Sequence, residues 1–226
     1  MTFGIRFIPA ALVLAVVTSA GAHAALTGTS PLNPGDTIFV TQIPSGVDPG
    51  TLLASETVPF TTSINASGVL VAAVFREASG TLDFYYQISD NASSIDSLAR
   101  ETNTDFTGFS TAVGYRTDGG TLLPMANPFV NGSVPPVFAD RNAPGDVVGF
   151  SFNQSDATKI QPGQTSNVLV ISTNATNFTA GHSSVIDGGT ITVAAFQPEA
   201  AVPEPLSLLL LGGGLLALGS IRRFRS

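Results

Sequence analysis

Residues 68–89 constrain the fold more than any other part of the sequence. Within them, Leu82, Phe84, Tyr86 and Ile88 alternate with Thr81, Asp83, Tyr85 and Gln87. This period of two is typical of a half-buried β-strand, because successive side chains point to opposite faces of a sheet. The three residues Ala78, Ser79 and Gly80 precede the alternation, and a glycine there can adopt a positive φ. Residues 68–89 therefore predict a β-hairpin.

Further short runs rich in Val, Ile, Phe and Thr predict more strands. No window keeps apolar residues at helical spacing for more than two turns. The predicted strands cover residues 37–42, 106–116, 147–152, 167–173 and 190–196. Turns are predicted at Asp118-Gly119-Gly120, at Pro162-Gly163 and at Asp187-Gly188-Gly189.

This pattern predicts an all-β fold in which two antiparallel sheets pack as a jelly-roll-like β-sandwich. Residues 92–101 fit either one helical turn or an edge strand. Residues 122–144 contain five prolines and are predicted to be mainly loop, with a short edge strand near Val137.

The first 24 residues have the features of a secretory signal peptide. Arg6 precedes an apolar stretch, residues 7–17, that is short for a membrane span. Ala22 and Ala24 place small side chains where signal peptidase accepts them. We therefore expect cleavage after Ala24 and a mature chain that begins with Ala25. The alternative is an uncleaved N-terminal anchor.

Residues 25–196 are then predicted to form one β-sandwich domain. Residues 197–205 follow as a linker, since their three prolines favour an extended spacer. The chain contains no cysteine, so an apolar core has to hold the domain without disulfides.

The charge of residues 25–205 limits the class of partner. This part carries five basic and all sixteen acidic residues, an excess of eleven negative charges. Binding to nucleic acid or to an anionic membrane surface needs clustered Lys and Arg, so neither is expected. An acidic surface rich in Ser, Thr, Asn and Gly is typical of soluble extracellular proteins.

The C-terminus combines three features in a fixed order. Pro203-Glu204-Pro205 comes first, an uncharged apolar stretch at residues 206–221 follows, and Arg222, Arg223 and Arg225 come last. As a helix, residues 206–221 would be about 24 Å long, shorter than the roughly 30 Å hydrocarbon core. Residues 206–226 are thus predicted to be a short transmembrane helix with a basic cytoplasmic tail. An ordinary permanent anchor is the alternative.

This arrangement resembles the PEP-CTERM sorting signal of Gram-negative bacteria, a module also labelled as an ice-binding-protein C-terminal domain. The resemblance covers the last 25 residues. It implies recognition and cleavage by an exosortase near the Pro-Glu-Pro motif, after transient insertion in the inner membrane. It also implies export to the cell surface or matrix and an association with exopolysaccharide and biofilm. The body loosely resembles other members in "SGTLDFYYQIS" and "SSVIDGGTITVAAF", which implies a β-sandwich and no site residues.

Catalytic motifs are not evident in residues 25–205. His182, between Gly181 and Ser183, is the one histidine there, and it is expected at a turn or on the surface. We find no nucleophile elbow, zinc-binding helix motif or Cys-His cluster, and we expect neither a metal nor another cofactor. The chain is therefore predicted not to be an enzyme. A hydrolase acting on matrix polymers through two of its sixteen acids is the weaker alternative.

Two binding functions stay open from the sequence. Tyr85, on the polar side of its strand, is a candidate platform for a sugar ring, so a carbohydrate-binding module for exopolysaccharide is the first alternative. Asp90, Asn91 and Asp96 are close enough in sequence for a calcium loop, although a plain Asx-rich loop is favoured because the spacing does not match an EF-hand. The leading hypothesis is an exported, non-enzymatic surface or matrix protein.

Overall fold

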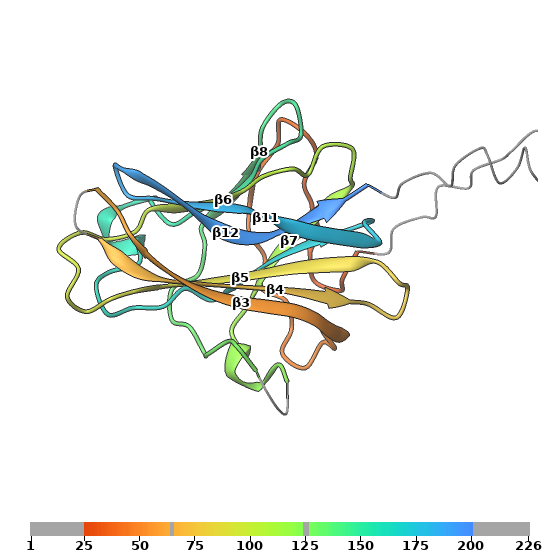
Figure 1. Ribbon diagram of the computed structural model, residues 1–226, viewed down its shortest axis with the longest axis horizontal. Helices are drawn as coiled ribbons and strands as arrows, with labels where there is room; N and C mark the ends of the chain where they lie inside the picture. The colour runs from red at the N-terminus through yellow and green to blue at the C-terminus, as the bar shows by residue number, and fades with distance from the viewer. Residues whose placement is uncertain (1–24, 64–65, 124–126, 201–226) are drawn as a thin grey trace, which may run out of the picture.

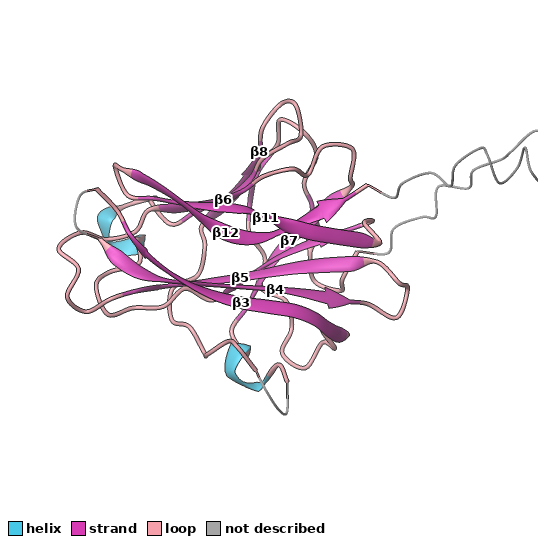
Figure 2. Cartoon of the chain, in the orientation of Figure 1, coloured by secondary structure: helices cyan, strands magenta, loops and turns pink. Residues whose placement is uncertain are grey.

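The chain folds into two stacked antiparallel β-sheets (Figure 1). This computed structural model describes residues 25–63, 66–123 and 127–200. Helical structure in these residues is limited to two short 3-10 turns, η1 (Gly119–Thr121) and η2 (Asp156–Thr158), as Figure 2 shows. The all-β prediction and the packing of two sheets are therefore confirmed.

Sheet A has six strands in the order β1-β7-β10-β5-β4-β3. Their bounds are β1 (Ser30–Pro31), β7 (Thr111–Arg116), β10 (Val168–Thr173), β5 (Leu82–Asp90), β4 (Ser67–Arg76) and β3 (Thr51–Thr61). The predicted hairpin is β4–β5, and Gly80 in its turn has a φ of 91°. This positive φ is the conformation for which a glycine is required at that turn.

Sheet B also has six strands, in the order β12-β11-β6-β9-β8-β2. Their bounds are β12 (Thr190–Glu199), β11 (Asn177–Ile186), β6 (Arg100–Asn103), β9 (Val148–Ser151), β8 (Phe138–Arg141) and β2 (Thr37–Phe39). Strand β6 shows that residues 92–101 are mostly loop and enter a strand at their end. Strand β8 begins one residue after Val137, where a short edge strand was expected, but it lies between β9 and β2 rather than at the edge of the sheet.

Two long strands were missing from the prediction. Strand β3 is an edge strand of sheet A, and its sequence contains a glutamate and a proline that weaken its resemblance to a strand. Strand β11 contains His182, which was expected at a turn or on the surface. His182 is exposed, but it lies within the strand and pairs with Ala194. In both strands, hydrogen-bonded pairing with a neighbouring strand outweighs the weak β-propensity of the local sequence.

The last strand extends three residues past residue 196, the predicted end of the domain. Strand β12 continues through Gln197, Pro198 and Glu199, and Pro198 lies opposite Phe178 of β11. Proline is tolerated here because β12 is an edge strand, where a missing N–H need not interrupt a ladder. The strand therefore takes up the first third of the predicted linker.

The main core lies between the sheets. Buried apolar side chains of β4, β5, β7 and β10 meet those of β8, β9, β11 and β12. Phe84 of sheet A meets Phe106 edge to face, with ring centroids 5.8 Å apart. Apolar burial of this kind is the main contribution that stabilises a domain without disulfides.

A second core covers the outer face of sheet A and corrects the prediction of a half-buried β5. Tyr85, expected on an exposed polar face, is fully buried, as are Asp83 and Gln87. The N-terminal segment and the loop after β7 fold back over this face and bring Leu26, Ile43, Leu122 and Phe129 against Tyr85. Gln87 ties the loop down, because its Nε2 donates to Val130 O at 2.8 Å and its Oε1 accepts from Val130 N at 3.0 Å.

Candidate functional site

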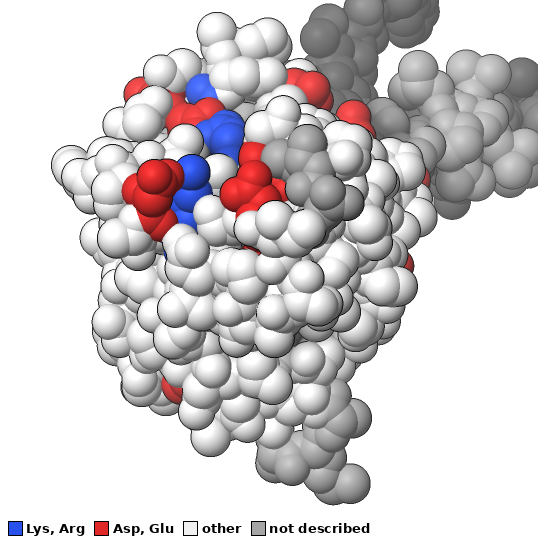
Figure 3. All heavy atoms as spheres, turned by 90° about the vertical axis from the view of Figure 1, so that its left-hand side faces the viewer, with Lys and Arg blue, Asp and Glu red and all other residues white. Residues whose placement is uncertain are grey.

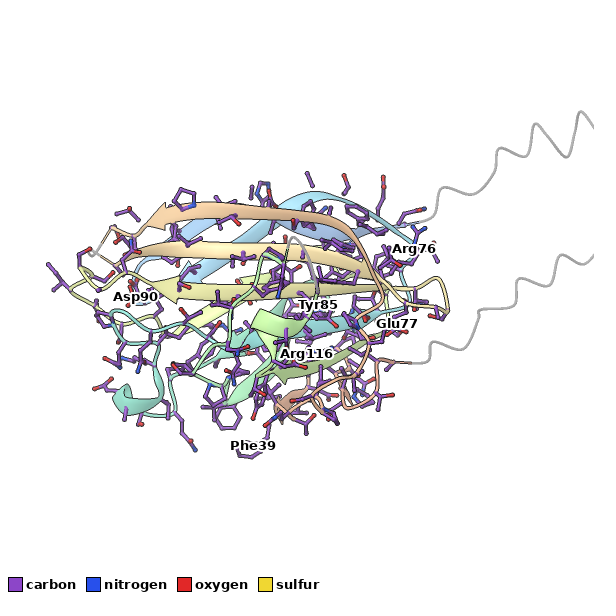
Figure 4. The ribbon with its side chains drawn as sticks, turned by 90° about the horizontal axis from the view of Figure 1, so that it is seen from below. Phe39, Arg76, Glu77, Tyr85, Asp90 and Arg116 are labelled. Carbon is purple, nitrogen blue, oxygen red and sulfur yellow. The ribbon has the colours of Figure 1, made fainter. Side chains whose placement is uncertain are left out.

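The titratable groups of interest gather on the outer face of sheet A, beneath these covering loops. Figure 4 looks onto that face and shows Tyr85 and Arg116 side by side, with Glu77 toward the end where the described chain begins. Asp83 and Tyr85 come from β5, Arg116 from the end of β7, and Glu77 from the β4–β5 turn. We call Glu77, Asp83, Tyr85 and Arg116 the outer-face cluster.

Arg116 holds one covering loop in place. Its Nε and Nη2 donate to the two carboxylate oxygens of Asp118 at 3.0 and 3.1 Å, and Nη2 also donates to Val47 O at 2.7 Å. Burial alone would lower the pKa of Arg116, but the hydrogen bonds and charge of Asp118 and Tyr85 outweigh it and raise this pKa. Asp118 in turn accepts from Gly46 N at 3.1 Å. The pair therefore joins β7 to the loop before β3.

Asp83 is the most unusual group of the cluster. It lies opposite Ser172 of β10, and its side chain has no exposed surface. Within the described residues, neither carboxylate oxygen receives a hydrogen bond of ordinary geometry, although the Ser172 hydroxyl is close enough to lower its pKa. Burial and then the neighbouring Glu77 dominate and raise the pKa of Asp83 to about 9. Asp83 therefore favours its neutral form at this position.

Tyr85 interacts with both Asp83 and Arg116. Burial first, and then the charge of Asp83, raise the pKa of its phenol, while Arg116 acts in the opposite direction. Its ring packs on Phe75 with centroids 4.6 Å apart and on Phe129 at 6.2 Å. A fully buried ring cannot stack on a sugar, so Tyr85 is not the carbohydrate platform that the sequence suggested.

Two pockets lie at the end of the domain where the described chain begins, and one of them includes Glu77 of the cluster. A pocket of about 360 Å³ is lined by the start of the chain, by Asp48 and by Glu77. A larger groove of about 760 Å³ is lined by amide and hydroxyl side chains, among them Asn33, Ser110 and Asn174. Arg141 lies at the groove wall and donates to Phe106 O at 2.7 Å and to Gly145 O at 2.8 Å. This groove has the chemistry to bind a neutral polar ligand.

A further acid lies between the sheets. Glu101 of β6 is fully buried, and its Oε1 accepts a hydrogen bond from Ser183 Oγ at 2.7 Å. Burial raises the pKa of Glu101 to about 7, while hydrogen bonds from Ser183 and Asn103 act against that rise. Glu101 contributes pH-dependent stability rather than a binding site, since it is enclosed by the core.

Asp90, Asn91 and Asp96, the candidate calcium ligands, do not gather at one site. Asp90 is buried at the end of β5, Asn91 Nδ2 donates to Ser67 Oγ at 3.0 Å, and Asp96 Oδ1 accepts from Ser97 N at 2.8 Å. In residues 25–63, 66–123 and 127–200, no three His, Cys, Asp or Glu side chains gather in a way that could hold a metal ion. Asp90 therefore ends strand β5, and Asn91 and Asp96 make separate hydrogen bonds in the segment that follows it.

Most of the predicted sorting and processing residues lie outside the described residues. These are Ala22, Ala24, Pro203, Glu204, Pro205, Arg222, Arg223 and Arg225, together with the predicted segments 1–24 and 206–226. Ala25 is described and lines both pockets. No helix in the described part of the chain has the length and apolar character to cross a membrane.

Comparison of the chain with protein-family models, with curated proteins and with solved structures finds no match. The outer-face cluster was missed at the level of sequence because its members are scattered over residues 77–116. The alternation of side chains in residues 81–88 correctly placed Asp83 and Tyr85 on the same face of β5. It contained no signal that loops from two other parts of the chain would cover that face.

Proposed function

We propose that this chain is an exported, non-enzymatic protein of the cell surface or extracellular matrix, sorted by an exosortase through its C-terminal signal. Signal peptidase removes residues 1–24 in this proposal. The jelly-roll-like form of the sandwich, the signal peptide and the transmembrane helix are predictions within it. So is the association with exopolysaccharide and biofilm.

The observation that carries the proposal is the place of the sorting motif relative to the last strand. Strand β12 ends at Glu199, and Pro203-Glu204-Pro205 begins four positions further along the chain. The motif, the apolar stretch and the arginine cluster then follow without interruption. Cleavage near the motif would therefore release the sandwich without removing any residue of its twelve strands.

The arrangement of the domain supports the same function. The described chain begins and ends at the same end of the sandwich (Figure 1). The opposite end is free for contacts in a matrix. Figure 3 shows that end, where acidic and basic groups are intermixed in one region and most of the remaining surface is uncharged. A mixed surface of this kind suits a soluble component of a hydrated matrix.

The mass of the mature protein tests the proposal. We expect protein from the surface of the producing bacterium to lack residues 206–226. Glu204→Ala should leave the C-terminal segment attached, because it removes the charge between the two prolines. The matched control is Glu199→Ala, which removes an exposed acid at the end of β12. A measured mass that still includes residues 206–226 in the wild-type surface protein would contradict the proposal.

Carbohydrate binding is a second candidate function, favoured by the groove beside Asn33, Ser110 and Asn174. Amide and hydroxyl groups can replace the water around sugar hydroxyls. Ser110→Trp should fill the groove and abolish retention of the protein on exopolysaccharide of the producing strain. Asn153→Trp places the same bulk at another exposed position and should retain binding. Equal retention of both variants would count against this candidate.

A further inference from the structure

The beginning of the mature chain lies against an acidic pocket. Leu26 is buried in the second core, and its backbone N donates to Ser172 Oγ at 3.1 Å. Ser172 is the register partner of Asp83. Ala25 precedes Leu26 and lines the pocket of about 360 Å³ together with Asp48 and Glu77. The nitrogen of Ala25 is therefore within one residue, about 3.8 Å along the chain, of a backbone N–H anchored beside Asp83.

Carboxylate oxygens without a hydrogen bond of ordinary geometry lie in the wall of this pocket and beside it. Within the described part of the chain they are Oε1 of Glu77, which lines the pocket, and both oxygens of Asp83, which does not line it but interacts with Glu77. Asp83 is completely buried, and unpartnered buried carboxylates are destabilising unless a cation or donor reaches them. The nearby cation, Arg116, is engaged by Asp118 in a two-point ion pair. The pocket thus has room and negative charge for one more cation.

We propose that this pocket binds the α-ammonium group of Ala25, which comes into existence when signal peptidase cuts after Ala24. Before cleavage, the Ala25 nitrogen is part of a neutral amide and offers one N–H. Hydrolysis of that peptide bond leaves a carboxylate on Ala24 and an α-amino group on Ala25, which takes up a proton. The resulting ammonium has three N–H donors and one positive charge. It joins the N-terminus to β5 and to the β4–β5 turn.

The groups that face this ammonium explain the expected direction of its titration. Asp48 and Glu77 line the pocket, and Asp83 interacts with Glu77 from the sheet beside it. Tyr85 and Arg116 do not line the pocket, and Arg116 is paired with Asp118. Opposite charges nearby favour the charged form of an amine, so its pKa should lie above the ordinary 7.7–8.0. In the mature protein, the ammonium should also favour the charged form of Asp83.

The sequence makes the test unusually direct. The chain contains a single lysine, Lys159, so the mature protein has two amino groups, the other being the α-amino group of Ala25. We would isolate the processed protein from an exporting Gram-negative host and follow its acylation by an amine-reactive ester, with Lys159 as the internal reference. At pH 8, the α-amino group should react about tenfold more slowly in wild type than in Asp83→Asn or Glu77→Gln.

The matched control is Asp90→Asn. Asp90 is also buried on β5, but it lies at the opposite end of the strand from Glu77 (Figure 4). Asp90→Asn should leave the reaction rate of the Ala25 amine unchanged. As a second measurement, acylation of the α-amino group should lower the urea midpoint of wild type and leave that of Asp83→Asn unaffected. This coupling separates ammonium binding from a general loss of stability in the variant.

The inference rests on the signal-peptide part of the proposed function, and the outcomes distinguish the two. Equal acylation rates in wild type and Asp83→Asn, in protein that begins at Ala25, would overturn the inference and leave processing intact. Protein that begins at another residue would overturn it as well, because the proposed ammonium would not exist. Retention of residues 206–226 would contradict exosortase sorting alone and would not affect the result at Ala25.

Discussion

Arg116 and Asp118 form a two-point ion pair that closes a loop over the outer face of sheet A. Nε and Nη2 of Arg116 lie 3.0 and 3.1 Å from the two oxygens of Asp118, and the Arg116 side chain is 1% exposed. A buried guanidinium that loses its carboxylate keeps its desolvation cost without the compensating attraction. The pair is therefore the contact that most directly holds the loop around Val47 on the sheet.

Asp118→Asn should lower the free energy of unfolding by about 2–3 kcal/mol, since it removes a charged acceptor from a buried arginine. Urea denaturation followed by circular dichroism would measure this loss. Asp156→Asn is the control, because Asp156 pairs with Lys159 at 2.7 Å while its side chain is 95% exposed. That variant should unfold like wild type. Identical curves for Asp118→Asn and wild type would contradict a structural role for the pair.

Glu101 should make the domain less stable as the pH rises. Its pKa is about 7 in the folded protein against an ordinary 4.5. The folded state therefore holds a proton that the unfolded state releases, and the free energy of unfolding falls as the pH passes from about 4.5 to 7. This contribution amounts to about 3 kcal/mol.

Glu101→Gln removes that titration and preserves an acceptor for Ser183. Urea titrations between pH 4 and pH 8 should give a shallower decline for the variant, and its advantage over wild type should grow with pH. The difference between the two profiles isolates Glu101, because Asp83 is present in both proteins. Parallel profiles would show that Glu101 is not enclosed as described.

Gly132→Ala should detach the loop that covers the middle of β5. A Cβ at this position would lie 1.9 Å from Ser166 O, too close for any side chain. We expect a loss of about 2 kcal/mol or more in the free energy of unfolding, because backbone rather than a flexible side chain has to move. Ser133→Ala adds no atom at this contact and is the control. A thermal midpoint for Gly132→Ala equal to that of the control would disagree with the close approach.

Arg141→Lys should loosen the wall of the large groove. The Arg141 guanidinium donates to Thr111 Oγ1 at 3.1 Å and to the carbonyl oxygens of Phe106, Phe109 and Gly145 at 2.7–3.0 Å. A lysine ammonium cannot reproduce this planar set of donors, so we expect a loss of about 3 kcal/mol. Hydrogen exchange should increase around Phe106 and Phe109. Arg76→Lys, at an exposed arginine, should leave exchange there unchanged.

The fold class could be predicted because β-strands and turns have recognisable local sequence patterns. Alternation in β5, glycines at turns such as Gly80 and Gly163, and the apolar run of β10 all depend on neighbours in the chain. The edge strands were harder to predict from the sequence. Strand β3 does alternate between inward and outward residues, but Glu56 and Pro59 obscure that pattern.

The outer-face cluster depended on information that no local pattern contains. Polar residues on one side of β5 predict an exposed face, and that expectation failed for Tyr85. The N-terminal segment and the loop around Phe129 cover this face, and such long-range packing follows from the whole chain. Asp83 could be placed on the correct side of its strand, but its burial and its proximity to Ser172 could not be predicted.

The edge position of β12 has a mechanical consequence. Glu199 pairs with Asn177 at the open end of the β11–β12 hairpin, shortly before the segment that carries the proposed sorting motif. Any load that the protein bears through its carboxyl end reaches this pair first. A hairpin pulled apart from its open end breaks its hydrogen bonds in turn rather than together. The domain should therefore yield to tension gradually from its tethered edge, while β5, at the interior of the other sheet, is shielded from the force.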